Sequence, residues 1–410
     1  MAGGRAESVT HARDLRTGRP VWLGRREPRV PAGRLGGNLK VDVVVVGAGI
    51  SGALVTDALL QAGLTVAAVD RRGVVKGSTP ASTALLQFEL DQPLTHLIRR
   101  VGRERAVRAY WRSAAAVDYL RDRIADLGIR CGLVERATAY LPGNVLRKAD
   151  LEAEARARAE VGLRSRWVER DELLAFAGID RPGAIISAGA AEADPAALAA
   201  GLWRAAIARG CRLFAPVEVT AIASNQARVT LGTDAGHEIE AKYAVFATGY
   251  ELVELVKPSG YRIVSTWAMA TAPQPDRLWP SRCLIWEAAD PYLYLRTTRD
   301  GRIVCGGEDE AFADEERRDA LIPKKVAAIG AKLGRLLPEV DTAAEFAWAG
   351  CFGESSTGLP AIGRIPGAER CFAVMGFGGN GITFSAVAAQ IIQRELLGLP
   401  DHDAALFAFE

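Results

Sequence analysis

The chain has 410 residues, of which 51 are Lys or Arg and 49 are Asp or Glu, so its formal net charge is +2. A charge this close to neutral excludes a general attraction to nucleic acid or to an anionic membrane, and the length predicts two interleaved lobes with a sizeable core. The six cysteines are far apart and include no C-x-x-C pair, which indicates reduced structural thiols, and we identify no set of metal ligands.

The first 40 residues hold eight arginines and Lys40 against three acidic residues, with Pro and Gly throughout. We interpret residues 1–40 as an exposed N-terminal arm. The arm lacks the apolar core of a secretion signal, so we expect a cytoplasmic protein. The longest uncharged stretch, residues 371–393, contains four glycines and Asn380. It therefore predicts a strand, a glycine loop and a buried helix, and no transmembrane segment.

A buried parallel strand is predicted over residues 41–46, which read VDVVVV and stop at Gly47. The GAGISG motif that follows places Gly47 at a tight turn. It places Gly49 where the backbone approaches a pyrophosphate, and Gly52 where a helix presses on the strand. Together with Ile50 and Ser51, these glycines predict a dinucleotide-binding loop.

A helix is predicted over residues 51–62, and a second strand over residues 64–69 ends at Asp70. An acid at this position is typical of a ribose-binding carboxylate, and it would repel the 2′-phosphate of NADP. Arg71 and Arg72 are interpreted either as partners of the adenosine end of the cofactor or as solvated charge.

The loop after Asp70 carries small hydroxylated residues and resembles the second FAD contact of the D-amino-acid-oxidase family. That family includes glycine oxidase, D-amino-acid dehydrogenase, sarcosine oxidase and gamma-glutamylputrescine oxidase. There the loop wraps the pyrophosphate and ribityl chain, a role that hydroxyls and backbone N–H groups suit. The resemblance implies FAD contacts at Gly77, Ser78, Thr79, Ser82 and Thr83.

Three later segments resemble the family in the same order, and the resemblance covers about residues 40 to 400. Residues 192–222 read as a helix followed by a strand, and the family's counterpart of Val219 and its neighbours clasps the adenine. A strand ending in Ala247, Thr248 and Gly249 closes over the cofactor. The last segment implies contacts of the flavin with a glycine loop and a helix start at Gly378, Gly379, Asn380, Gly381, Ile382 and Thr383.

The resemblance implies an α/β fold with a Rossmann-like FAD-binding lobe (GR2-type) and an interleaved mixed-β substrate lobe. The FAD-binding lobe would comprise residues 41–95, 190–255 and 345–410, and the substrate lobe residues 96–189 and 256–344. Within the last of these ranges, alternating and aromatic-rich runs predict four strands, and helical spacing predicts one helix.

In this family a hydride passes from the carbon that bears an amine to the flavin, and water hydrolyses the resulting imine. The resemblance therefore implies an amine or amino acid derivative as substrate and dioxygen or a quinone as acceptor. Lys257 is by analogy a lysine that could assist oxygen, with a surface lysine as the alternative. The oligomeric state is left open.

Amino-acid oxidases of the family hold the substrate carboxylate with arginines. Phe352 and Gly379 occupy the places where those arginines are expected, which puts a simple α-amino acid in doubt. Arg296 is the best remaining anion-binding candidate, with Tyr292 and Tyr294 lining the pocket. The alternative is that Arg296 only decorates a hairpin.

Sarcosine oxidases of the family attach FAD to a cysteine in the segment that contains Cys351. Here the corresponding position is Gly350, so we expect non-covalent FAD. Two other functions remain open. The chain could be a flavoprotein partner subunit of a hetero-oligomeric oxidase without its own substrate, or a NAD(P)-linked dehydrogenase that uses only the first motif.

Overall fold

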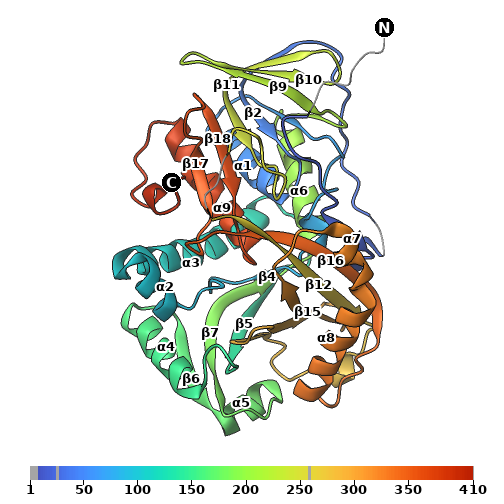
Figure 1. The fold of residues 1–410 in the computed structure, drawn as a ribbon, viewed down its shortest axis with the longest axis vertical. Helices are drawn as coiled ribbons and strands as arrows, with labels where there is room; N and C mark the ends of the chain where they lie inside the picture. Colours follow the sequence, from blue (N-terminus) through green and yellow to red (C-terminus); the bar gives the residue numbers. More distant parts are fainter. Residues whose placement is uncertain (1–7, 25–26, 257–259, 410) are drawn as a thin grey trace.

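The structure is a computed structural model that describes residues 8–24, 27–256 and 260–409. Two β-sheets dominate it, and helices cover them on several sides (Figure 1). The smaller sheet lies in the upper part of that view and the larger sheet in the lower part. Lys257 lies outside the described residues. The mixture of helices with two mixed sheets is the α/β class that the sequence predicts.

The smaller sheet holds the strands predicted on either side of the glycine motif. In the described part of the chain it has eight strands, with the order β17-β18-β11-β2-β3-β8 and with β10 and β9 added beside β11. Their bounds are β2 (Leu39–Val46), β3 (Val66–Val69), β8 (Arg212–Phe214), β9 (Val219–Ser224), β10 (Val229–Thr233), β11 (Glu238–Phe246), β17 (Ala361–Arg364) and β18 (Cys371–Met375). The strands β3, β2, β11 and β18 run parallel, so their carboxyl ends share one edge.

The β2 strand is buried on both faces, which explains its run of valines. Val43 and Val45 pack into the cluster that includes α1 and α9, whereas Val44 and Val46 pack against the opposite face. All of these side chains are at most 9% exposed. The predicted buried strand is therefore confirmed.

The larger sheet is mixed and, in the described residues, has ten strands. The order is β1-β16-β12-β15-β14-β13-β5-β7-β4, with β6 paired to β7. The bounds are β1 (Arg16–Gly18), β4 (Leu85–Leu86), β5 (Val134–Leu141), β6 (Ser165–Glu169), β7 (Gly183–Glu192), β12 (Arg262–Thr271), β13 (Leu284–Glu287), β14 (Leu293–Thr297), β15 (Ile303–Glu310) and β16 (Ala344–Glu354). The four strands predicted within residues 256–344 appear as β12 to β15.

The helices of the described residues include α1, α6, α8 and α9, which lie where the sequence predicted helices. Their bounds are α1 (Ile50–Gln61), α2 (Leu94–Val101), α3 (Arg103–Asp126), α4 (Lys148–Glu160), α5 (Arg170–Ala177), α6 (Pro195–Ala208), α7 (Glu315–Ala320), α8 (Ile322–Leu336) and α9 (Gly381–Leu396), with short 3₁₀ turns at Val21–Leu23, Thr79–Ala81, Pro275–Arg277 and Ala404–Leu406. Helix α6 starts where the Asp194 side chain accepts the N–H of Ala197. Among the described residues, no helix is long and apolar enough to cross a membrane.

Residues 8–24 and 27–40 of the N-terminal segment are built into the fold, which corrects the expectation of an exposed arm for these residues. Strand β1 pairs with β16 at the edge of the larger sheet. The N–H of Val9 donates to the carbonyl of Val219 at 3.2 Å, beside the smaller sheet. Val9, Leu15, Val21 and Leu35 are buried. These apolar residues lie among the arginines and anchor the segment. A count of charged residues alone did not reveal them.

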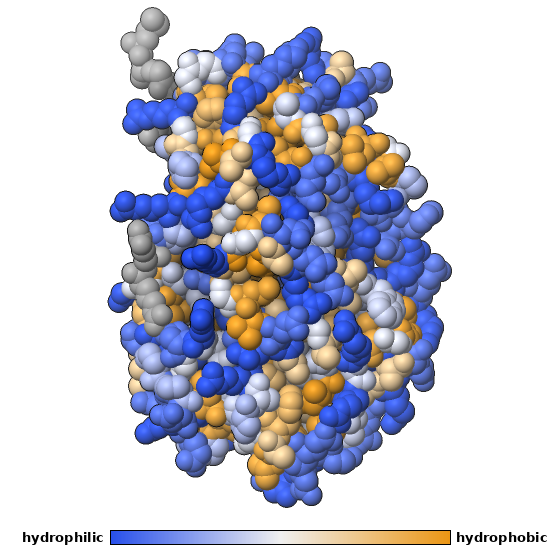
Figure 2. All heavy atoms as spheres, turned by 180° about the vertical axis from the view of Figure 1, so that it is seen from behind, coloured by the Kyte–Doolittle hydropathy of each residue, from blue (hydrophilic) through white to orange (hydrophobic). Residues whose placement is uncertain are grey.

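The two sheets do not follow the expected lobe boundaries at every strand. Strands β4 and β16 belong to the larger sheet, although both lie in ranges expected for the FAD-binding lobe. The division into two interleaved lobes is therefore kept as a proposal. Seen from behind, the surface is mostly hydrophilic, with hydrophobic groups between the charged ones, as is usual for folded proteins (Figure 2).

Candidate functional site

One pocket is lined by residues of both sheets and by the starts of α1 and α9. Nearly all of the predicted cofactor residues line it, although they come from segments that are far apart in the sequence. Those that line it are Gly47, Gly49, Ile50, Ser51, Asp70, Arg71, Arg72, Gly77, Ser78, Thr79, Ser82, Thr83, Val219, Ala247, Thr248, Gly249, Gly378, Gly379, Asn380, Gly381, Ile382 and Thr383. The chain thus brings the predicted segments together at the carboxyl edge of the parallel strands, where such folds bind ligands.

Gly52 does not line the pocket, and its geometry shows a packing role. A Cβ atom at Gly52 would lie 1.9 Å from the carbonyl oxygen of Gly47. Gly47 itself has a φ of +114°, and a Cβ there would lie 2.3 Å from the carbonyl oxygen of Ala247. The glycines therefore let α1, the turn after β2 and the end of β11 approach one another closely.

Asp70 stands at the end of β3 and faces the pocket. Its carboxylate accepts the N–H groups of Ala48, Arg72 and Gly73 at 2.7, 2.8 and 2.9 Å. Burial raises the pKa of Asp70, and these three hydrogen bonds act in the opposite direction. Each carboxylate oxygen can accept more than one hydrogen bond, so Asp70 still has capacity for ribose hydroxyls.

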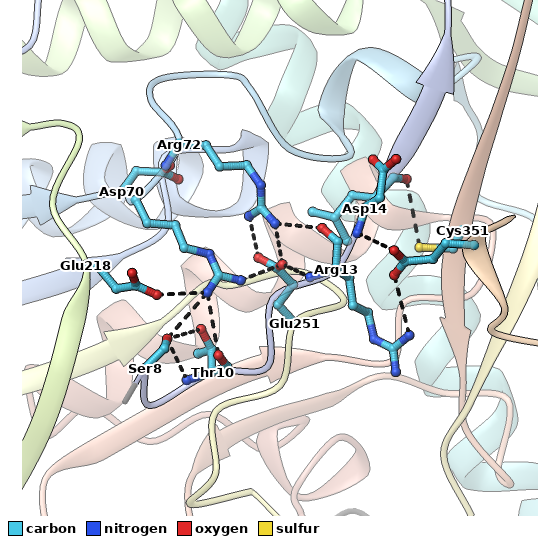
Figure 3. Close-up of polar contacts among 12 residues, drawn as sticks. Ser8, Thr10, Arg13, Asp14, Asp70, Arg72, Glu218, Glu251 and Cys351 are labelled. Atoms are coloured by element: carbon cyan, nitrogen blue, oxygen red, sulfur yellow. Dashed lines mark hydrogen bonds and ion pairs between the residues drawn. The ribbon is translucent and has the colours of Figure 1, made fainter. Parts of the chain in front are cut away.

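Arg71 and Arg72 are not merely solvated charge, because Glu251 binds both. The Nη2 atom of Arg71 lies 2.5 Å from Oε1 of Glu251, and Arg72 forms a two-pronged contact with the same carboxylate. The backbone N–H of Arg13 donates to Glu251 as well, at 2.6 Å. Figure 3 shows Arg72 and Arg13 converging on Glu251. Sequence reasoning missed Glu251, because 179 positions separate it from Arg72.

The N-terminal segment also contributes to this end of the pocket, which the sequence did not indicate. Ser8, Val9 and Thr10 line the pocket wall, and Arg71 donates to the Ser8 hydroxyl at 3.4 Å. Leu15 lines the wall farther along the segment. The segment expected to be an arm therefore covers part of the candidate site.

The loop after β4 runs along the start of α9 and is held there by three hydrogen bonds. The Thr383 hydroxyl donates to the carbonyl of Gln87 at 3.2 Å, and the Asn380 amide donates to the carbonyl of Glu89 at 2.8 Å. The N–H of Gly379 donates to Oδ2 of Asp91 at 2.7 Å. Sequence reasoning did not single out Gln87 or Asp91, although both line the pocket.

The residues present fit FAD. Ser78 has a buried hydroxyl for which no partner is found among the described residues, and it lines the pocket beside the glycine turn. Two helices, α1 and α9, begin at the pocket wall, and the first N–H groups of a helix bind anionic groups. The strand end at Asp70 supplies the carboxylate for a ribose.

Aromatic side chains form much of the remaining wall. Tyr292 and Tyr294 line the pocket as predicted, with ring centroids 5.5 Å apart. Trp286 lines it too, stacked on Tyr140 at 3.6 Å, and its indole Nε1 is buried without a partner in the described chain. Phe352 completes this aromatic end of the pocket.

Arg296 is not brought into the pocket. It is 2% exposed, and its guanidinium donates to the carbonyls of Thr83 and Ala193, both at 2.6 Å. It also lies 3.7 Å from Glu192 and over the ring of Trp22. Burial lowers the pKa of Arg296 to about 10. The role of substrate anion binder that we expected for Arg296 has no geometric support, because its donors face the protein interior.

Cys351 and Gly350 both line the pocket on β16. The Cys351 thiol is 9% exposed and lies 3.9 Å from the carbonyl of Leu15. Burial raises the pKa of Cys351 to about 11, so the thiol is protonated at neutral pH and is a poor nucleophile.

Comparison with known proteins places the chain among flavin enzymes. The family model DAO, described as FAD dependent oxidoreductase, matches residues 42–394. Glycine oxidase of Bacillus licheniformis is 25% identical over 90% of this chain and 97% of its own length. The crystal structure of glycine oxidase from Geobacillus kaustophilus covers 91% of this chain and 99% of its own, with a TM-score of 0.74 and 21% identity. L-proline dehydrogenase from P. horikoshii covers 90% and 97%, with a TM-score of 0.76 and 16% identity.

Proposed function

Since this chain belongs to the DAO family of FAD-dependent oxidoreductases, we propose that it oxidises a CH–NH group of an amine or amino acid derivative to an imine. One observation carries the proposal. The predicted cofactor segments are far apart in the sequence but line a single pocket, and the rest of its wall includes several aromatic side chains. Such a wall can hold an organic substrate and exclude bulk water, while a few polar groups fix its orientation.

The chain's own residues would hold the cofactor in a defined way. Asp70 would accept the ribose hydroxyls, and the starts of α1 and α9 would bind the pyrophosphate and the pyrimidine edge. When bound, FAD supplies the acceptor for the hydride that leaves the substrate carbon. The aromatic end would hold the substrate as a neutral amine.

We further propose that FAD is bound without a covalent link. The Cys351 thiol is protonated at neutral pH, which disfavours attack on the flavin. Acid precipitation of the purified yellow protein is expected to leave the flavin in the supernatant. A yellow pellet would contradict this expectation, and Cys351→Ser would then test whether this thiol forms the link.

The first experiment is the visible spectrum of the purified protein under anaerobic conditions. We expect an oxidised flavin spectrum that bleaches when an amine substrate is added. Single amines with and without an α-carboxylate would identify the substrate type. Hydrogen peroxide release in air would then distinguish an oxidase from a dehydrogenase that uses a quinone.

A second candidate is a flavoprotein partner subunit without its own substrate. Phe352 and Gly379 favour it, since both line the pocket and neither offers a cation for a carboxylate. Bound flavin that no amine bleaches, together with a stable second chain that co-purifies, would establish this function in place of amine oxidation.

A further inference from the structure

The charged side chains of the pocket wall fall into two groups. The first group lies around the end of β3, where Arg71 and Arg72 pair with Glu251. Arg71 also contacts Glu218 at 3.2 Å, and Asp70 accepts three backbone N–H groups. These charges are therefore compensated by the protein itself.

The second group is Asp91 alone. Its Oδ2 atom accepts the N–H of Gly379, and its Oδ1 atom has no hydrogen-bond donor in the described chain. No cation pairs with Asp91 among those residues either. The residue is exposed, and it lines the pocket. The pocket thus presents a carboxylate that nothing in the described protein neutralises.

Further acceptors accompany Asp91. Gln87 belongs to the same loop and is 7% exposed, and its Oε1 atom is buried with no partner in the described residues. Asp309 of β15 does not line the pocket, but its carboxylate oxygens are buried and interact with Thr266 and Tyr292, which do. Trp286 and Tyr292 line the same pocket. Carboxylate and amide acceptors beside aromatic faces are the chemistry that binds an ammonium group.

The Asp91 carboxylate lies next to Gly379, one of the two positions where an arginine was expected. A Cβ atom at Gly379 would lie 2.9 Å from Oδ1 of Asp91. A side chain at position 379 would therefore extend into the space that the Asp91 carboxylate fills. At the other position where an arginine was expected, Phe352 adds an uncharged ring. This part of the wall favours a cation over an anion.

We propose that the substrate is a diamine or polyamine, and that Asp91 binds its second, unreacted ammonium group with Gln87 as a further acceptor. The proposal rests on the amine oxidation proposed above and names the substrate class of that site. Asp91 acts here as a specificity-determining residue. The carbon that bears one amine loses the hydride, and the other amine remains charged and anchors the molecule.

The test compares α,ω-diamines of three to six carbons with n-alkylamines of the same lengths, by anaerobic flavin reduction in a stopped-flow instrument. A charge-assisted hydrogen bond contributes about 1.5–3 kcal/mol. The wild-type protein should therefore prefer the diamine by at least about tenfold, measured as the limiting reduction rate divided by the half-saturation concentration.

Asp91→Asn keeps an oxygen for the Gly379 N–H but removes the charge. It should raise the diamine half-saturation concentration by at least about tenfold and leave both limiting rates and the monoamine constants within about twofold.

Asp122→Asn on α3 removes an equal charge from an exposed position and should leave the diamine preference unchanged. A readout independent of turnover is calorimetry with 1,4-diaminobutane, on protein whose flavin has been reduced beforehand with dithionite and so accepts no hydride. The wild-type flavoprotein should bind this diamine, and Asp91→Asn should weaken binding by at least about tenfold.

Three outcomes would overturn the proposal. Equal efficiency of flavin reduction by monoamines and diamines would contradict the ammonium-binding role of Asp91, but not the proposed amine oxidation. If Asp91→Asn lowers the limiting rate of flavin reduction equally for monoamines and diamines, Asp91 acts on the amine that reacts and not on a second ammonium group. If no amine bleaches the wild-type flavin, the proposed function itself fails, and the substrate class fails with it.

Discussion

At the scale of single residues, the pocket wall combines positions that sequence patterns predict with others that they do not. Gly47 and Gly52 follow from the motif, because each lacks space for a Cβ atom. Asp91 carries no local motif, and only the fold places it in the pocket wall. The role of the predicted glycines can be tested by substitution with alanine, which adds one methyl group.

Gly52→Ala is expected to destabilise the protein and to abolish FAD retention. The new Cβ would lie 1.9 Å from the Gly47 carbonyl oxygen, so α1 must move away from the turn that ends β2. Overpacking of this kind costs roughly 1–3 kcal/mol or more, which urea unfolding would measure. Gly37→Ala is the matched control, since nothing lies within 4 Å of a Cβ there. Equal stability and FAD content in the two variants would contradict the packing role.

Asp309→Asn is expected to stabilise the protein at pH 7. Burial raises the pKa of Asp309 to about 6, with Asp91 and Glu354 adding to the rise, against hydrogen bonding with Thr266 and Tyr292. The folded state thus disfavours the charged form, at a cost of up to roughly 3 kcal/mol that is complete above pH 6 and absent below the unfolded pKa near 4. The gain in the free energy of unfolding should therefore disappear as the pH falls from 6 to 4. A variant that is equally stable, or less stable, at pH 7 would show that the charged Asp309 carboxylate does not destabilise the folded state.

At the scale of elements, strand ends and helix starts converge on the pocket, and the N-terminal segment joins them. Strand β1 pairs with β16, next to Gly350 of the pocket wall. Ser8 and Thr10 lie beside Arg71 at the other end. The segment therefore spans the pocket from one sheet to the other.

Deletion of residues 1–18 is expected to weaken FAD retention without preventing folding of the two sheets. It removes edge strand β1 together with the pocket residues Ser8, Val9 and Thr10. The dissociation constant for FAD, measured by flavin fluorescence during dilution, should rise by at least about tenfold, because part of the wall opens to water. Deletion of residues 1–7 alone, which removes none of these residues, is the comparison. Unchanged affinity in the longer deletion would contradict a covering role.

At the scale of the whole molecule, the pocket joins the two sheets, because residues of both line it. A ligand held there contacts strands from both sheets at once. Its binding free energy then adds to the stability of the whole chain rather than to one sheet.

Removal of FAD is expected to lower the thermal unfolding temperature of the whole chain. FAD at a thousandfold excess over its dissociation constant would stabilise the folded protein by about 4 kcal/mol. Differential scanning calorimetry of stripped and reconstituted protein should show one transition that moves upward with FAD concentration. Two transitions, of which only one responds to FAD, would instead indicate sheets that unfold independently.

The sequence alone determined the features that depend on local chemistry. The valine run of β2, the glycines of the turn and the acid at the end of β3 are contiguous patterns, so the dinucleotide-binding loop follows from them. FAD and the fold class followed from the resemblance of this and later segments to a known family. The tertiary structure decided which distant charges meet. It paired Arg72 with Glu251 and turned Arg296 toward backbone carbonyls, and among the described residues it left Asp91 without a cation beside Gly379. No local pattern encodes these contacts, because their partners lie up to 288 positions apart and are brought together only when the two sheets close on one pocket.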